Sequence, residues 1–300
     1  MIDAPSSTWF TASPHWHVLI VMHFILGALA GGTYFLSAII DLTGHDRRLA
    51  RLGYYITLPL MAVIGIVLIV DLSRPDRFWH LLVENHTLQP IFKWWVPMST
   101  GAWSVLLLGV FAVLSFLAAF AEHHRPQWRL ARRLRPPGAL GAFVAVPGAL
   151  VALHVTGYTG VMLSVLNRPI WSDTPLFGLL FIVSAVAMAA ALLSLAARGL
   201  RWQSPSVPAL QRIWVWLLAA QVLVWAALFI TLGPAASGWL NVWGAVLAIG
   251  IAIGTVLPLL AAFWRTGWGL GSGPAAAALV LAGGAIVRTA IVFVPEAIAP

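Results

Sequence analysis

The chain has 300 residues, of which 61% are hydrophobic and only 9% are charged. Soluble domains carry about 25% charged residues, so this composition, with a mean hydropathy of +0.92, excludes a soluble globular protein and predicts an all-α polytopic membrane protein. The net charge of +8 does not indicate nucleic-acid binding, because arginines gather on the cytoplasmic loops of membrane proteins. Without cysteine, the chain cannot itself ligate an iron–sulfur cluster through thiolates.

Eight apolar stretches are long enough to cross a bilayer, which takes about 20 residues in a helix. Such spans must be helical, because lipid offers no hydrogen bonds to an open backbone. In chain order, the predicted spans are residues 17–41, 52–72, 95–121, 139–166, 175–198, 211–232, 240–264 and 274–294. We expect two four-helix bundles, formed by residues 1–170 and 171–300, of which the second is mainly structural.

The arginines of the predicted links indicate how the spans are oriented. The links after spans 1, 3, 5 and 7 carry arginine, whereas the N-terminal tail and the loop at 233–238 carry neither Lys nor Arg. The positive-inside rule therefore predicts cytoplasmic odd-numbered links, with both termini on the outer, periplasmic side. The exceptions, which fall on the predicted outer side, are Arg74, Arg77, Lys93 and Arg168.

The stretch DLSRPDRFWHLL, residues 71–82, follows the second span and gathers five polar side chains at the predicted outer surface. The predicted topology does not explain its two arginines. One interpretation is a functional site. The other is an interfacial turn, in which Arg and Asp pair with each other while Trp79 lies in the aromatic belt of the membrane surface. The spacing alone leaves both interpretations open.

The titratable groups lie mostly in the first four spans, since all nine histidines occur at or before His154 and all four tyrosines at or before Tyr158. At about 1.5 Å per residue, His23 lies roughly 9 Å and Tyr158 roughly 12 Å below the outer ends of their spans. His154 is one turn deeper on the Tyr158 face, and Asp71 closes the second span. We predict that these side chains converge in the outer half of the first bundle, because ionisable groups at such depth are functional candidates.

Simpler interpretations stay open for each of these residues. A lone histidine in a membrane helix often serves only as a hydrogen-bond partner between helices, and Tyr158 also suits an interfacial anchor. Gly31, in the small-residue stretch of the first span, either permits close helix packing or leaves room for a flat ring.

Five stretches, taken in order, carry a family resemblance. They are HFILGALAGGTYF in the first span, DLSRPDRFWHLL after the second, PMSTGAWSVLL in the third, GYTGVMLSVLNRPIWSDTPLFGLLFIVSA across the fourth and fifth, and GGAIVRTAIV in the eighth. Through these stretches the chain resembles the NrfD/PsrC family, the membrane subunits of polysulfide, nitrite, tetrathionate and related reductase complexes. The resemblance covers most of the chain and implies eight helices.

The resemblance implies an integral membrane subunit that exchanges electrons and protons between a bound quinone, menaquinone or ubiquinone, and a partner iron–sulfur subunit. The implied partner is a four-cluster ferredoxin-like protein on the outer face, joined to a molybdopterin-type catalytic subunit, so that the chain is not an enzyme by itself. The resemblance also implies that this chain holds no haem and no metal. The expected location is the bacterial cytoplasmic (inner) membrane.

The same resemblance implies roles for individual residues. His23 and Tyr158 match the family's quinone-contacting histidine and tyrosine, and Asp71 matches the acidic residue that closes its second helix, so these three are the expected catalytic residues. Further residues expected at the quinone are Arg74, His80, His154 and Gly31. One position departs from the family's pattern, because Ile20 replaces an amide side chain one turn before His23 and so removes one donor to a quinone carbonyl.

Two other functions stay open at this stage. A haem b-type electron-transfer subunit needs two intramembrane histidines, which His23 and His154 supply. A small-molecule transporter is the other, although transporters commonly carry repeats in both halves and the halves of this chain differ in polarity. Because no ionisable residue lies between Arg212 and Arg265, we expect no side-chain proton relay in the second bundle, and therefore scalar chemistry with proton exchange at the outer face.

Overall fold

The computed structural model describes residues 16–72, 74–202, 204–266 and 273–298. In this described part, eight helical segments are long and apolar enough to cross a membrane, which confirms the predicted all-α polytopic fold. The spanning elements are α1 (Val18–Thr43), α2 (Arg47–Asp71), α3 (Pro97–His124), α5 (Ala139–Ser164), α6 (Phe177–Gly199), α7 (Val207–Leu232), α8 (Val242–Ile251) continued by the π-helical η3 (Ala252–Val256) and α9 (Leu257–Thr266), and α10 (Pro274–Phe293). The shorter elements are η1 (Pro75–Leu81), α4 (Arg129–Arg133), η2 (Gly233–Trp239) and η4 (Val294–Ala297).

The second spanning helix begins earlier than the sequence predicted, at Arg47 rather than at residue 52. Gly44, with φ at +68°, ends α1, and the Asp46 side chain then caps α2 by accepting a hydrogen bond from the Leu49 amide at 2.9 Å. An aspartate at this position satisfies an amide that would otherwise lack a partner. Hydropathy did not predict the first turn of α2, because this turn is helical but contains polar arginines.

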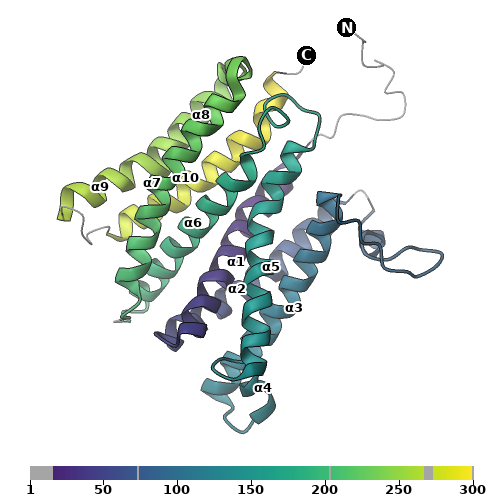
Figure 1. The fold of residues 1–300 in the computed structure, drawn as a ribbon, viewed down its shortest axis with the longest axis vertical. Coiled ribbons are helices and arrows are strands. Elements are labelled where there is room, and N and C mark those ends of the chain that lie inside the picture. The colour runs from purple at the N-terminus through teal and green to yellow at the C-terminus, as the bar shows by residue number, and fades with distance from the viewer. Residues whose placement is uncertain (1–15, 73, 203, 267–272, 299–300) are drawn as a thin grey trace.

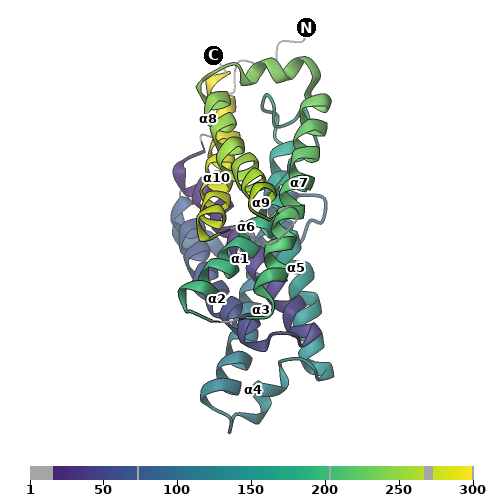
Figure 2. The same ribbon diagram turned by 90° about the vertical axis from the view of Figure 1, so that its left-hand side faces the viewer.

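The spanning helices form two groups that lie side by side (Figure 1). The first group consists of α1, α2, α3 and α5, and the second of α6, α7, α8–α9 and α10. Helix α1 connects the groups, because it contacts α2 and α5 in its own group and also α6 and α10 in the other. In Figure 2, the second group lies in front of the first. The described chain begins and ends at the upper end of Figure 1, while α4 lies at the lower end.

Glycines allow the helices to touch backbone to backbone. A Cβ atom on Gly31 would lie 2.7 Å from the carbonyl oxygen of Ala152, and one on Gly32 would lie 2.6 Å from that of Ala185. Small residues at these positions let membrane helices approach closely. Gly31 therefore packs α1 against α5, and its position is filled by the neighbouring backbone instead of leaving room for a ring.

Replacing Gly32 by Ala should lower the stability of the fold, since the added methyl group meets the fixed backbone of α6. We expect a loss of about 1–3 kcal/mol, the usual cost of overpacking. Gly65→Ala is the matched control, because nothing lies within 4 Å of a Cβ at that helical position. Thermal unfolding of both variants in detergent is the measurement, and equal unfolding midpoints would contradict the packing role.

Candidate functional site

A buried histidine–tyrosine pair joins α1 to α5. Nε2 of His23 and the hydroxyl oxygen of Tyr158 are 2.6 Å apart and form a hydrogen bond. The His23 and Tyr158 side chains are both buried, at 2% and 7% exposure. Each residue lies within roughly 10 Å of the upper end of its helix. The structure thus brings these two predicted residues together at one depth.

The Tyr158 ring is fixed by its neighbours on two sides. A Cβ atom on Gly101 of α3 would lie 2.2 Å from Cε2 of Tyr158, so the ring rests on the α3 backbone where only glycine fits. On the other side, the His154 ring stacks on Tyr158 with centroids 6.1 Å apart and an interplanar angle of 13°. These contacts hold the hydroxyl group of Tyr158 toward His23.

The second ring nitrogen of His23, Nδ1, is buried and has no hydrogen-bond partner in the described part of the chain. A buried polar atom without a partner costs about 1–3 kcal/mol, so such an atom is expected to meet a ligand. Because Nε2 bonds directly to Tyr158, no flat ring fits between the two side chains. Nδ1 of His23 is therefore the ring nitrogen left without a hydrogen bond in the described residues, while Nε2 is bonded to Tyr158.

Asp71, the last residue of α2, is half-buried at the upper end, and in the described part of the chain it makes no hydrogen bond to the pair. Its electrostatic partner is His17, the N-cap residue of α1. His17 lies six positions before His23 on the same chain segment. The sequence analysis did not predict His17 as a site residue. The available signal was its position, because His17 is a titratable group at the start of the span that holds His23.

The polar stretch after α2 divides into outward and inward side chains. Arg74, Asp76 and Arg77 are exposed on η1, and the Asp76–Arg77 ion pair is loose at 3.8 Å. Exposed pairs of this kind contribute little stability. His80 is half-buried against Trp79, with ring centroids 3.9 Å apart, and its Nε2 is buried without a partner in the described residues. In the described residues, neither Arg74 nor His80 hydrogen-bonds to the His23–Tyr158 pair.

His154 faces outward, contrary to the expectation that it lies inside the bundle at a quinone. Its side chain is exposed on α5, although its ring stacks on Tyr158. Positions four apart on a helix differ by about 40° of rotation, which turns His154 out of the core while Tyr158 stays in. Since His23 bonds to Tyr158 and His154 points away, the two histidines do not face one another, which disfavours bis-histidine haem ligation.

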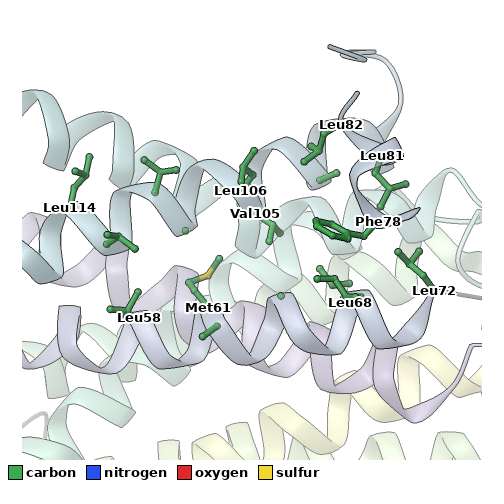
Figure 3. Close-up of a pocket in the computed structure, with 17 residues that line it drawn as sticks. Leu58, Met61, Leu68, Leu72, Phe78, Leu81, Leu82, Val105, Leu106 and Leu114 are labelled. Atoms are coloured by element: carbon green, nitrogen blue, oxygen red, sulfur yellow. The ribbon is translucent and has the colours of Figure 1, made fainter. Parts of the chain in front are cut away.

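An apolar groove runs between α2 and α3 and is closed at its upper end by η1 (Figure 3). Its volume is about 600 Å³ and its walls are almost entirely hydrocarbon. Met61, Leu68 and Val105 line the groove and also pack in the core cluster that contains Tyr158. The groove therefore shares part of its wall with the core cluster to which Tyr158 belongs.

Arg288 of α10 is fully buried, and its hydrogen-bond partners in the described part of the chain are all neutral. Its guanidinium donates to Ser184 Oγ at 2.9 Å and lies over the Phe181 ring, 4.9 Å from the centroid. The Phe181 ring meets Phe24, which is the neighbour of His23. The guanidinium is therefore held by dipoles and an aromatic face, on the side of α1 toward the second group.

The sequence matches a known protein family. The family described as polysulphide reductase, NrfD, matches residues 10–298, nearly the whole chain. The chain belongs to the NrfD family. NrfD proteins are membrane quinone-reactive subunits of oxidoreductase complexes and work with other redox subunits. Comparison with curated proteins gave no match. Family membership favours the redox interpretation of this NrfD chain over a transporter.

Replacing Tyr158 by Phe should destabilise this NrfD protein, because it leaves Nε2 of His23 buried without its partner. The expected cost is about 1–3 kcal/mol. Tyr55→Phe is the matched control, since the Tyr55 hydroxyl is buried without any hydrogen-bond partner in the described residues and its removal breaks no bond. Thermal unfolding in detergent compares the two, and a Tyr55→Phe loss as large as that of Tyr158→Phe would refute the role of the pair.

Proposed function

We propose that this protein is the quinone-reactive membrane subunit of a respiratory oxidoreductase complex, and that it exchanges electrons and protons between menaquinone or ubiquinone and a partner iron–sulfur subunit. The observation that carries the proposal is the buried His23–Tyr158 pair, with Nδ1 of His23 left for a ligand oxygen. Membership of a quinone-reactive family supports it.

The hydrogen bond to Tyr158 lets neutral His23 serve either redox form of a quinone. When bound, a quinone takes up two electrons and two protons as it becomes quinol. If Tyr158 donates to Nε2, Nδ1 carries the proton and donates to a quinone carbonyl; if Nε2 donates to Tyr158, Nδ1 accepts from a quinol hydroxyl. Tyr158 has a hydroxyl that can act in either role. The pair therefore positions one proton at one ring oxygen in both directions of the reaction.

Protons would leave or enter at the upper end, through Asp71 and His17. Asp71 is half-buried there and interacts with His17, which begins the helix that holds His23. Imidazole and carboxyl groups are the side chains that commonly transfer protons in enzymes. Between Arg212 and Arg265 the sequence offers no ionisable side chain. We therefore propose scalar proton exchange at one face rather than transport through the second group.

The iron–sulfur partner, a four-cluster ferredoxin-like subunit, would dock at the same upper end and pass electrons to a molybdopterin-type catalytic subunit. The loop between η1 and α3 projects on the right-hand side of Figure 1, from the ends of α2 and α3, and exposes Phe92, Trp94 and Trp95. Aromatic residues of this kind are enriched in protein interfaces. In the proposed orientation, this end faces the periplasm of a bacterial inner membrane.

The isoprenoid tail of the quinone would lie in the groove between α2 and α3. The groove is apolar along its whole length, and its floor packs with the cluster that holds Tyr158. Figure 3 shows the groove running from Leu114 to the η1 residues that close its upper end. A tail seated here places its ring end near the depth of the pair.

Replacing His23 by Ala should lower the quinone-linked turnover rate of the purified complex by about 100-fold or more, because a proton-transferring group is lost. Activity with a soluble redox dye that donates directly to the partner should be unchanged. His45→Ala, an exposed histidine at the lower end, serves as control. A parallel fall of dye-linked and quinone-linked rates in His23→Ala would disprove the assigned role.

Filling the groove should weaken binding of long-chain quinones only. In Gly65→Phe and Gly109→Phe, the new ring enters open space, because nothing lies within 4 Å of a Cβ at either position. Losing on the order of ten atomic contacts, at about 0.1 kcal/mol each, raises KM roughly fivefold. The control is Leu107→Phe, on an exposed face of α3 outside the groove.

Steady-state kinetics with a long-chain quinol and with a tail-less analogue separate the possibilities. The groove variants should raise KM for the long-chain substrate and leave the analogue unaffected. If neither substrate responds, the tail lies elsewhere and ordinary lipid occupies the groove.

A further inference from the structure

A second concave site lies at the lower end of the first group, far from the His23–Tyr158 pair. It is a pocket of about 630 Å³ between the end of α3, α4 and the start of α5. We call it the arginine pocket. Its charged lining residues are Arg47, Glu122, Arg129, Arg132, Arg133 and Arg135.

A buried ion-pair network forms the floor of the arginine pocket. Arg135 donates from Nε to Asp41 Oδ2 at 2.8 Å and from Nη1 to Glu122 Oε2 at 2.7 Å, and Arg47 donates from Nη2 to the same Glu122 oxygen at 2.8 Å. Burial lowers the pKa of Arg135, but its bonds to Asp41 and Glu122 outweigh burial and hold that pKa above the usual value. Two carboxylates thus neutralise two arginines.

The backbone at Arg135 and Pro136 is held in place by the first turn of α5. A Cβ atom on Gly141 would lie 2.2 Å from the backbone carbonyl carbon of Arg135, so the first turn of α5 rests directly on this segment. Arg47 also donates to the carbonyl oxygen of Pro136 at 2.5 Å. The floor of the pocket is therefore a fixed platform rather than a loose loop.

Three arginines of the rim have no carboxylate to compensate them. Arg129, Arg132 and Arg133 are exposed and take part in none of the ion pairs found in the described part of the chain. Arg132 donates only to the carbonyl oxygen of Pro126, at 3.1 Å. Three cations around a neutral floor repel one another and attract an anion, and guanidinium groups match the geometry of phosphate oxygens.

Exposed hydrocarbon occurs on α4 and α5, the helices that form the pocket, and Leu140 itself lines it. Leu130 is 72% exposed and Phe143 is 71% exposed, and Leu140 and Trp128 are exposed beside them. Leu140 and Phe143 lie in the first turns of α5, a helix that enters the membrane. A soluble anion leaves these side chains uncovered, whereas a lipid covers them with its acyl chains.

We infer that the arginine pocket binds an anionic phospholipid, whose phosphate contacts Arg129, Arg132 and Arg133 while its acyl chains lie along Leu140 and Phe143. Basic pockets at the membrane boundary of helical proteins recognise such headgroups. The bound lipid would fasten the α3–α4–α5 corner to the bilayer. The inference is independent of the quinone chemistry proposed for the upper end.

Native mass spectrometry of the full-length protein tests this inference, with cardiolipin, phosphatidylglycerol and phosphatidylcholine titrated separately in mild detergent. Each arginine near the surface contributes roughly fivefold to binding of an anionic lipid. The double variant Arg132→Gln/Arg133→Gln should therefore bind cardiolipin and phosphatidylglycerol roughly 25-fold more weakly. Phosphatidylcholine should bind weakly to every form.

The matched control is Arg198→Gln/Arg201→Gln, which removes the same charge from exposed positions outside the pocket. It should retain anionic lipid as the unaltered protein does. Arg132→Lys/Arg133→Lys keeps the charge and should restore most of the affinity, which separates binding from any folding defect. Thermal unfolding of each variant without lipid is measured alongside.

Three results would overturn the inference. An equal loss of affinity for anionic lipid in the pocket and control variants would mean that the lipid is attracted to the basic surface in general and not to this pocket. Equal binding of phosphatidylcholine would mean that the charges are not used. Displacement of the lipid by millimolar inorganic phosphate would mean a site for a soluble anion.

Discussion

A lipid bilayer offers no hydrogen-bond partner to a buried polar group, and this constraint governs where the protein places its few polar side chains. Backbone groups are satisfied within the spanning helices. Some buried side chains are instead satisfied across helices, as His23 is by Tyr158 at 2.6 Å and Tyr34 by Ser115 at 2.8 Å. Each of these bonds joins helices far apart in sequence, so the polar groups specify which helices neighbour one another. Nδ1 of His23 is one of eight buried side-chain atoms left without a hydrogen bond in the described residues, and it is the one that lies on the His23–Tyr158 pair.

The two groups of helices differ in where their titratable side chains lie and in what holds them. In the first group, titratable side chains occur at both ends and at intermediate depth, with Asp71 and His17 above and the Asp41–Arg135 pair below. In the second group, Arg288 is the buried cation, and Ser184, backbone carbonyls and an aromatic ring hold it in place of a carboxylate. Among the described residues, no carboxylate or imidazole bonds to this guanidinium. This arrangement favours the expectation that the second group is mainly structural.

The parts of the fold that depend on length and apolarity could be predicted from the sequence. Eight spans followed from hydropathy, because each must bury about 20 residues in lipid. The meeting of His23 and Tyr158 followed from depth, because both are counted from span ends on the same side. Depth does not specify rotation about the helix axis, however. That is why His154 was expected inside the bundle, whereas it faces outward.

Other features depend on neighbours that no single-chain pattern reveals. Gly31 suited a ring or a helix contact equally well, and only the position of Ala152 on α5 decides for packing. The interaction of Asp71 with His17 joins two helix ends, and the groove between α2 and α3 exists because η1 folds over its end. The direct bond between His23 and Tyr158 was also hidden, since sequence separates the two residues by 135 positions.

The residue one turn before His23 links these observations to the proposed chemistry. The family resemblance implies an amide there, but this chain has Ile20, which packs against the apolar cluster that includes Trp171 and Phe24. An aliphatic side chain cannot donate to a quinone carbonyl, so Nδ1 of His23 becomes the donor or acceptor on that segment of α1. In the proposed mechanism, the tautomer of His23 then decides which redox form is held. With Ile20 at this position, a single imidazole, that of His23, would recognise one ring oxygen. The hydrogen bond between α1 and α5 would then belong to the redox site as well as to the fold.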